Sequence, residues 1–245
     1  MGAGPVTAAF FNFHPGMVGR AVPACWDTVA PSTLVTLRAA AAAEALRHLC
    51  PPPSLAALAG ALPLLRQAAW GVGGEGRMLA GANRELWSSI GSALTALGLG
   101  EHELGVAEAW QACTTLREHR GDGHVAALVS QGLSGLEAHL LVSGTEGTAV
   151  EILRDNRGWS EAEWRHGGQG LAGRGLLQAD GTATERGHEV RRSVEALTER
   201  LAEPAYAALS DDEVGSLHRA LRAAAGPIQA SELLPFPNPM GLPRL

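Results

Sequence analysis

Six of the eight residues from Arg117 to His124 carry an ionisable side chain, in a chain in which only 18% of residues are charged. This segment, REHRGDGH, lies between two apolar helical patterns, so part of it is expected to be buried. Ionisable groups held against apolar surroundings must be paired, or their pKa values shift. Enzymes place acids and bases in such settings, so the segment is a candidate site for proton transfer.

In this interpretation histidines act as acids and bases, carboxylates orient them or take a proton, and arginines hold an anionic group. The candidate catalytic residues are His14, Glu118, His119, Asp122 and His124. The candidate substrate-binding residues are Arg38, Asn83, Arg117, Arg120, Glu137 and His139. Arg38 stands alone in an Ala-rich helix, and we expect it either to pair with Asp122 or Glu137 or to clamp a ligand carboxylate.

Two other interpretations of the segment stay open. It is equally typical of a structural salt-bridge network, since such networks also perturb pKa values. His119, Asp122 and His124 also form an H-x-x-D-x-H pattern, but none of the usual zinc-binding spacings is present. We therefore expect a metal-free site. No cofactor is expected either, because GVGGEG at 71–76 lacks the lysine and the preceding strand of a phosphate loop.

Composition narrows the class of protein. The net charge of −6 over 245 residues argues against a bulk attraction to nucleic acid or to an anionic membrane. All 19 basic residues are arginine, and the three cysteines have no CxxC spacing, which predicts reduced thiols in a cytoplasmic protein. The sequence shows no signal peptide and no apolar run long enough to span a bilayer, so we expect no membrane partner.

The first part of the chain reads as helical after an irregular or short-helical start over residues 1–30. Ser32 or Thr33 is expected to cap a helix that runs to about residue 49. Its packing face is predicted to hold Leu34, Leu37, Ala41, Ala45 and Leu49. Further helices are predicted over 54–70, 84–97 and 101–119. Gly121 and Gly123 are expected to break the last of them, and Asp122 to cap the helix that follows.

The C-terminal part has a different order of elements. A helix over 146–158 is followed by a second helix at 160–173, with Ser160 and Glu163 as a capping box. LLQADGTAT then predicts two short strands around an Asp-Gly turn. Thr184 is expected to cap a long amphipathic helix, and Ser210 with Glu213 the last one. Helix, helix, hairpin and helix is the order of a winged helix-turn-helix.

A family resemblance covers most of residues 10–210. LAGRGLLQADGTATERGHEVRRSVEALTERLAEPAYAAL is similar to the wing and dimer helix of MarR-type proteins. LREHRGDGHVAALVSQGLSGLEAHLL, with His14-Pro15 and GRMLAGAN upstream, resembles a family of high-GC bacterial proteins catalogued only as helix-turn-helix proteins. The resemblance implies a mostly α protein, with a helical N-terminal domain packed on a MarR-like winged helix with a two-stranded wing. It also favours His14, because the family pattern carries His-Pro at this place.

These patterns together predict three regions. Residues 1–143 form the helical domain with the REHRGDGH cluster, 144–225 the winged helix-turn-helix with the terminal helices, and 226–245 a Pro-rich tail. The segment at 160–173, in the position of a recognition helix, offers Glu161 and Glu163 against Arg165. Gly167, Gly168 and Gly170 would cost about 1 kcal/mol each in an exposed helix. Specific binding of DNA is therefore not expected.

The predicted function is binding of a small organic ligand or substrate in a pocket between the two halves. We expect an enzyme that performs cofactor-independent acid/base chemistry: cyclisation, isomerisation or elimination. Its place in specialised metabolism rests on the resemblance and on the compositional bias. The alternative is a ligand-responsive transcriptional regulator of the MarR type that binds DNA as a dimer, so a homodimer is compatible with the sequence. A non-catalytic structural partner is the third interpretation.

Overall fold

The computed structural model describes residues 2–71 and 73–245, which fall into two compact units. Unit 1 comprises residues 1–28, 123–201 and 236–243, and unit 2 comprises residues 29–122, 202–235 and 244–245. The two units interleave along the chain, whereas the expected regions 1–143, 144–225 and 226–245 follow it in order. That linear division stays a prediction.

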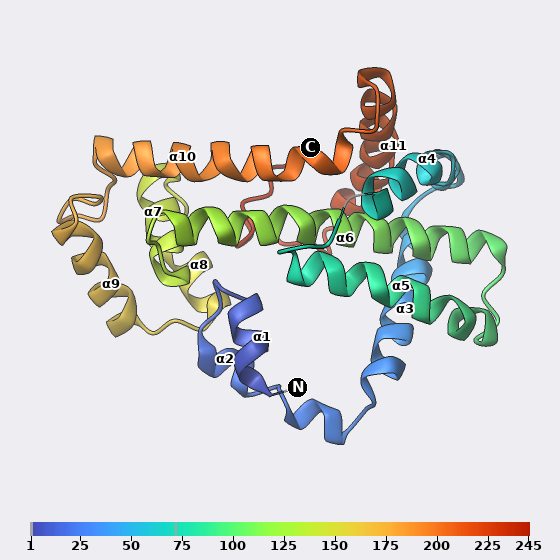
Figure 1. The fold of residues 1–245 in the computed structure, drawn as a ribbon, viewed down its shortest axis with the longest axis horizontal. Coiled ribbons are helices and arrows are strands. Elements are labelled where there is room, and N and C mark those ends of the chain that lie inside the picture. The colour runs from blue at the N-terminus through green and yellow to red at the C-terminus, as the bar shows by residue number, and fades with distance from the viewer. Residues whose placement is uncertain (1, 72) are drawn as a thin grey trace. The chain divides into compact units, whose positions relative to one another are not determined.

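Almost all regular structure in the described residues is helical (Figure 1). The α-helices are α1 (Ala3–Ala9), α2 (Pro15–Gly19), α3 (Pro31–Leu49), α4 (Pro52–Gly71), α5 (Met78–Ala96), α6 (Glu101–Ser130), α7 (Gly135–Glu146), α8 (Val150–Arg157), α9 (Glu161–Gly173), α10 (Glu185–Ala202) and α11 (Asp211–Ala230). Two short 3-10 helices are η1 (Ala24–Asp27) and η2 (Glu203–Tyr206). The fold is therefore mostly α, as predicted.

Unit 2 is a helical bundle with two apolar clusters. In one, α4 packs along α11 and against α6, with Leu65 and Ala68 fully buried. In the other, α3 and α5 enclose Ala39 and Leu94. The predicted packing face of α3 is wrong, since Leu34 and Leu37 are 43% and 50% exposed. The central run of alanines in α3 carries little amphipathic pattern, so tertiary packing selected another face.

The start of α3 also differs from the prediction. Pro31 occupies the first helical position and Ala30 precedes it, with no side-chain cap, so neither Ser32 nor Thr33 caps this helix. Proline suits this position because its fixed φ is already helical and its missing N–H would have no partner within the helix.

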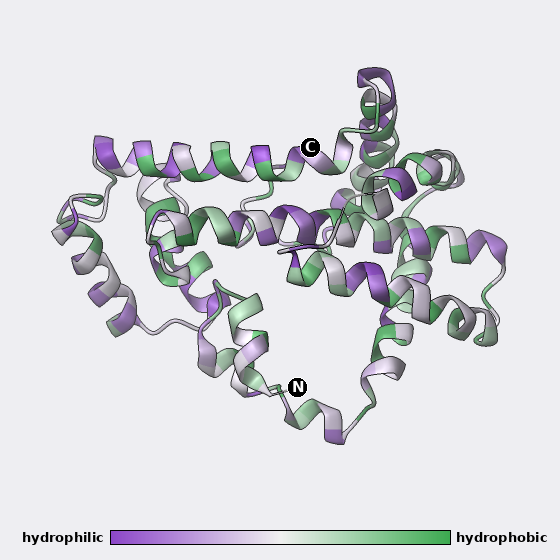
Figure 2. Cartoon of the chain, viewed as in Figure 1, coloured by the Kyte–Doolittle hydropathy of each residue, from purple (hydrophilic) through white to green (hydrophobic). Residues whose placement is uncertain are grey.

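The predicted helix break at Gly121 and Gly123 is also wrong, because both lie inside the continuous 30-residue helix α6. Asp122, expected to cap a following helix, instead accepts hydrogen bonds from Leu79 N (3.0 Å) and Ala80 N (2.9 Å) in the first turn of α5. Asp122 therefore provides hydrogen-bond acceptors for the first backbone N–H groups of α5, a helix that lies far from it in the sequence. The REHRGD segment forms a hydrophilic band within α6 (Figure 2).

Unit 1 is built around α7, α8 and α9, which pack on one another and on the end of α6. The predicted capping box of α9 is confirmed, and α7 has a second one formed by Ser134 and Glu137. Gly167 allows close contact between α9 and α7. A Cβ on it would lie 2.8 Å from Leu140 and 3.0 Å from Leu136. This glycine therefore serves packing, although it lowers helix propensity.

The two predicted strands of the hairpin are reduced to one isolated antiparallel bridge between Leu177 and Ala183 in the described part of the chain. Gln178 N still donates to Thr182 O (2.7 Å), and Gly181 has a φ of +87° at the turn. The tip is thus a tight turn, as the Asp-Gly pair predicts, but the flanks are too short to count as strands. Ala183 N donates to Gly144 O (3.0 Å), which holds this hairpin against α7.

The helices after the hairpin begin where predicted. Thr184 Oγ1 accepts from Gly187 N (3.0 Å) at the start of α10, and Ser210 with Glu213 forms the capping box of α11. Hydrophilic and hydrophobic residues alternate in bands along α10 (Figure 2). The predicted tail begins later than expected, because α11 contains Pro227 and ends at Ala230.

Candidate functional site

α8 and α9 are the two helices that the sequence predicts for the start of a winged helix-turn-helix. α8 is followed by Gly158, which has a φ of +79°, and α9 starts at Glu161 with Trp164 and Leu171 facing the core. Its exposed side chains include Glu161, Arg165, His166 and Gln169. The bounds of α9 match the segment predicted for the recognition-helix position.

Three of the four arginines of this region pair with its own acidic side chains. Residues 135–184 contain four arginines and seven acidic residues. Arg154 pairs with Asp155 (2.7 Å), Arg165 with Glu161 (2.9 Å) and Arg174 with Glu137 (2.9 Å). Arg157 lies over the Phe13 ring at 4.5 Å and donates to Pro239 O (3.2 Å). Acidic side chains therefore outnumber arginines around α9, and three of the four arginines pair with them.

A groove of about 810 Å³ runs beside α9, with α7 and the hairpin as its other walls. Its apolar lining comprises Leu140, Val150, Trp164, Ala172, Leu177 and Ala179. Polar side chains line it at a few points, including Arg165, Gln169 and Gln178. Asp180 accepts from Thr182 N (2.9 Å) and Thr182 Oγ1 (2.6 Å), which holds the hairpin tip and keeps the Asp180 pKa below its usual value.

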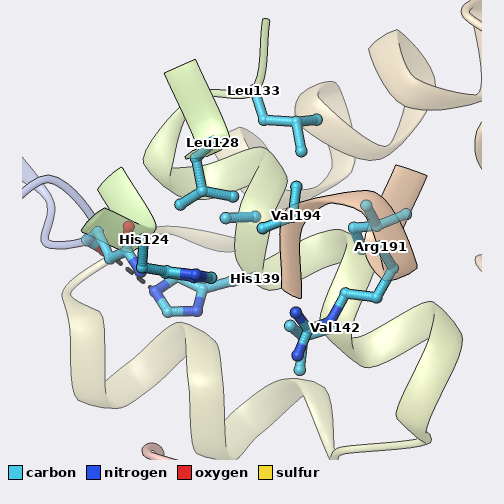
Figure 3. A pocket seen from close by; sticks show the side chains of 10 residues that line it. His124, Leu128, Leu133, His139, Val142, Arg191 and Val194 are labelled. Atoms are coloured by element: carbon cyan, nitrogen blue, oxygen red, sulfur yellow. Dashed lines mark hydrogen bonds between the residues drawn. The ribbon is translucent and has the colours of Figure 1, made fainter. Parts of the chain in front are cut away.

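A second, much smaller cavity of about 40 Å³ lies in the core of unit 1. Figure 3 shows the His124 and His139 rings next to each other on one side of it, with Arg191 reaching in from α10. His124 Nδ1 lies 3.0 Å from Thr198 Oγ1, and Arg191 pairs with Glu146 (2.6 Å). The volume suits a few water molecules and excludes an organic substrate.

His139 connects this cavity to the N-terminal segment. Its Nε2 donates to Asn12 O (3.2 Å), and Trp159 Nε1 donates to the same carbonyl (3.2 Å). Burial, followed by the positive charge of Arg157, lowers the pKa of His139 to about 4, against the raising effect of the Asn12 hydrogen bond. His139 is therefore neutral at pH 7.

The side chain of His14 links the N-terminal segment to α9. Its Nδ1 accepts from Gly16 N (3.0 Å), which leaves Nε2–H to donate to Glu163 (3.0 Å). The ring also contacts Trp159 edge-on at 5.0 Å. The irregular or short-helical start predicted for residues 1–30 thus packs through His14 on α8 and α9. The aromatic run FFNFHPG was the signal for this packing, and sequence reasoning did not use it.

Unit 2 holds most of the predicted cluster. His119 is 3% exposed and borders a void of about 10 Å³, lined in part by Gly73, Gly74 and Gly81. Arg77 donates to His119 O (2.7 Å), next to the Asp122 cap of α5. These contacts join α6 to the start of α5, as a structural network does.

The eleven predicted site residues occupy separate places. Arg38, Asn83, Glu118, His119 and Asp122 gather on α3, α5 and α6 of unit 2, and Arg117 and Arg120 are exposed on α6. Unit 1 holds His14, His124, Glu137 and His139. Arg38 pairs with neither Asp122 nor Glu137, because Asp122 caps α5 and Glu137 pairs with Arg174 in unit 1. Its hydrogen-bond partner is Asn83, at 3.5 Å.

Two further findings bear on the class of site. Within residues 2–71 and 73–245, no group of three or more His, Cys, Asp or Glu side chains is arranged to hold a metal ion. In the same residues, no single helix has the length and apolar character needed to cross a membrane. The metal-free site and the absence of a membrane partner stay predictions.

The chain was compared with known families, curated proteins and solved structures. The sequence model of a helix-turn-helix family matches residues 1–235. No curated protein and no solved structure matches the chain.

Proposed function

Because the chain belongs to the helix-turn-helix family, we propose that it is a winged-helix protein that binds a small organic molecule beside α9 instead of reading DNA with it. In this proposal α9 is the former recognition helix and residues 176–184 are a reduced MarR-type wing. The groove between them is the ligand site.

The pairing of the arginines is the observation that carries the proposal. Arg154, Arg165 and Arg174 each lie within 3 Å of a carboxylate oxygen. Proteins that bind DNA gain much of their affinity by neutralising phosphates with such side chains. Here that interaction would first require breaking contacts with Asp155, Glu161 and Glu137, so a phosphate gains little.

The groove has the size and lining of a small-molecule site. Such sites span roughly 300–1,000 Å³ and combine an apolar lining with a few polar groups. The groove of about 810 Å³ meets both criteria. Arg165 and Asp180 are its only titratable lining residues, and both are engaged in contacts of their own. The lining therefore favours a flat, mainly apolar molecule held by the amides of Gln169 and Gln178.

The proposal extends to acid/base catalysis, which would use residues of unit 2 and not the groove beside α9. The gathering of Glu118, His119 and Asp122 near α5 supports it, but nothing on α9 does. The alternative function is a ligand-responsive regulator, which family membership favours. In that case the same ligand would change the affinity of α9 for an operator, whereas the proposal made here requires binding of the ligand alone.

Filling the groove is expected to block ligand binding. Gly168 lines it, and a Cβ there would have Leu140 as its nearest neighbour at 3.9 Å, so Gly168→Leu projects into open space. With 1-aminoanthracene, a flat neutral fluorophore, as the probe, we expect this substitution to weaken binding by about tenfold or more. Fluorescence titration gives the dissociation constants.

Gly173→Leu is the matched control, because Gly173 lies on the same helix, has no neighbour within 4 Å of a Cβ and does not line the groove. Its affinity for the probe should equal that of the unmodified protein. Unchanged binding to Gly168→Leu, or equal losses in both variants, would contradict the proposed site.

A further inference from the structure

Arg38 on α3 is a cation with few partners. Its guanidinium carbon lies 5.0 Å from the centroid of the Trp110 ring, which orients the group. Among the described residues its recorded hydrogen bond runs from Nη2 to Asn83 Oδ1 and is 3.5 Å long, although a guanidinium has five N–H donors. Partial burial lowers the pKa of Arg38, while the charge of Glu118 raises it. The side chain therefore stays charged with most of its donors uncommitted.

The buried side chains of Asn83 and Gln111 are joined by hydrogen bonds next to Arg38. Gln111, which is fully buried, donates from Nε2 to Asn83 O (2.9 Å) and Asn83 Oδ1 (3.0 Å). Both partners are acceptors, so the orientation of the Gln111 amide is fixed. Gln111 thereby fixes the position of Asn83 Oδ1, the acceptor that Arg38 contacts.

We infer that Arg38, supported by Asn83 and Gln111, is a binding site for a small organic carboxylate. A guanidinium presents pairs of N–H groups that match the two oxygens of a carboxylate, and partial desolvation strengthens that contact. Leu34, one turn earlier on α3, and Leu37 are both exposed and provide an apolar surface for the organic part. The site lies in unit 2 and does not depend on the groove of unit 1.

Glu118 is the carboxylate that opposes an anion at this site. Its charge acts on Arg38, but the two side chains form no ion pair, because Glu118 pairs with Arg117. Removing this charge should strengthen binding of an anion, whereas a purely structural Arg38–Glu118 contact predicts no such gain.

The test is a calorimetric titration with benzoate, using benzamide as an uncharged molecule of the same shape. We expect benzoate to bind the unmodified protein at least tenfold more tightly than benzamide does, and Arg38→Met to weaken benzoate by about tenfold or more. Glu118→Gln should bind benzoate several-fold more tightly. Arg38→Lys keeps the charge without the paired donors, so its affinity for benzoate should lie between those of the unmodified protein and Arg38→Met.

Arg47→Met is the matched control, since Arg47 lies on the same helix and pairs with Glu103. It should bind benzoate like the unmodified protein. The inference is overturned if the unmodified protein does not bind benzoate, if Arg38→Met binds it equally well, or if Arg47→Met loses as much. If Arg38→Met does not fold, the other two variants test the inference. Arg38→Lys should bind benzoate more weakly than the unmodified protein, and Glu118→Gln should bind it more tightly.

Discussion

Acidification from pH 7 to pH 4 is expected to lower the free energy of unfolding of unit 1 by about 3 kcal/mol through His139 alone. The pKa of this imidazole falls from an ordinary 6.5 to about 4 in the folded protein, mainly because it is buried. Below pH 6.5 the unfolded chain therefore binds a proton that the folded chain does not. Stability is lost progressively over this window and levels off below the folded pKa.

The measurement is urea unfolding at several pH values between 7 and 4, in the unmodified protein and in His139→Gln. Glutamine can still donate to Asn12 O but does not titrate, so its stability should change less with pH. Carboxylates with lowered pKa values, such as Glu163 and Glu213, lose their contribution at lower pH, so the comparison above pH 4.5 isolates the imidazole. Equal pH dependence in the two proteins would contradict the burial of a neutral His139.

Gly135→Ala is expected to destabilise unit 1 by about 3 kcal/mol or more and to release the N-terminal segment. A Cβ at Gly135 would lie 2.0 Å from Phe11 O, a backbone atom that cannot move without displacing residues 10–14. That movement would break the hydrogen bonds that His139 and Trp159 make to Asn12 O. Thermal unfolding and the rate of proteolysis within residues 1–28 measure the two effects.

Gly170→Ala is the control, because a Cβ at Gly170 in α9 has no neighbour within 4 Å. Alanine has the higher helix propensity, so this change should leave stability unchanged or raise it by up to about 1 kcal/mol. If Gly135→Ala is as stable and as resistant to proteolysis as Gly170→Ala, the N-terminal segment does not pack on α7 as described.

Local signals predicted helix starts well. The capping boxes at Ser160 and Ser210 and the cap at Thr184 are confirmed, because each depends on residues within three positions of one another. The same signal at Ser134 and Glu137 was overlooked, and Glu137 was assigned to ligand binding instead. Short-range chemistry of this kind is readable from sequence.

Long-range contacts explain the errors. Gly121 and Gly123 weaken a helix by about 1 kcal/mol each. α6 nevertheless continues through them, because the helical residues before and after them are packed in apolar clusters. Asp122 does cap a helix, but that helix is α5, more than 40 residues earlier. No local pattern identifies such a partner.

The candidate site was predictable in part. The cluster of residue types pointed to Arg38, Asn83, Glu118, His119 and Asp122, which the fold brings together in unit 2. The groove beside α9 was not predicted, since it depends on how the hairpin docks on α7 at Gly144 and not on any residue that carries chemistry. The excess of acidic side chains around α9 was readable from the sequence, but the partner of each arginine was not.

We propose that the arginines around α9, three of which pair with the protein's own carboxylates, do not read DNA. Selection from a pool of random duplexes at about 150 mM salt tests it most directly, because weak phosphate contacts fail at that ionic strength. We predict no enriched sequence for the unmodified protein, and weak, sequence-independent binding that increases in Glu161→Gln, where Arg165 is released. An enriched sequence bound with a dissociation constant below about 100 nM, and lost in Arg165→Ala, would contradict the account and establish the protein as a DNA reader.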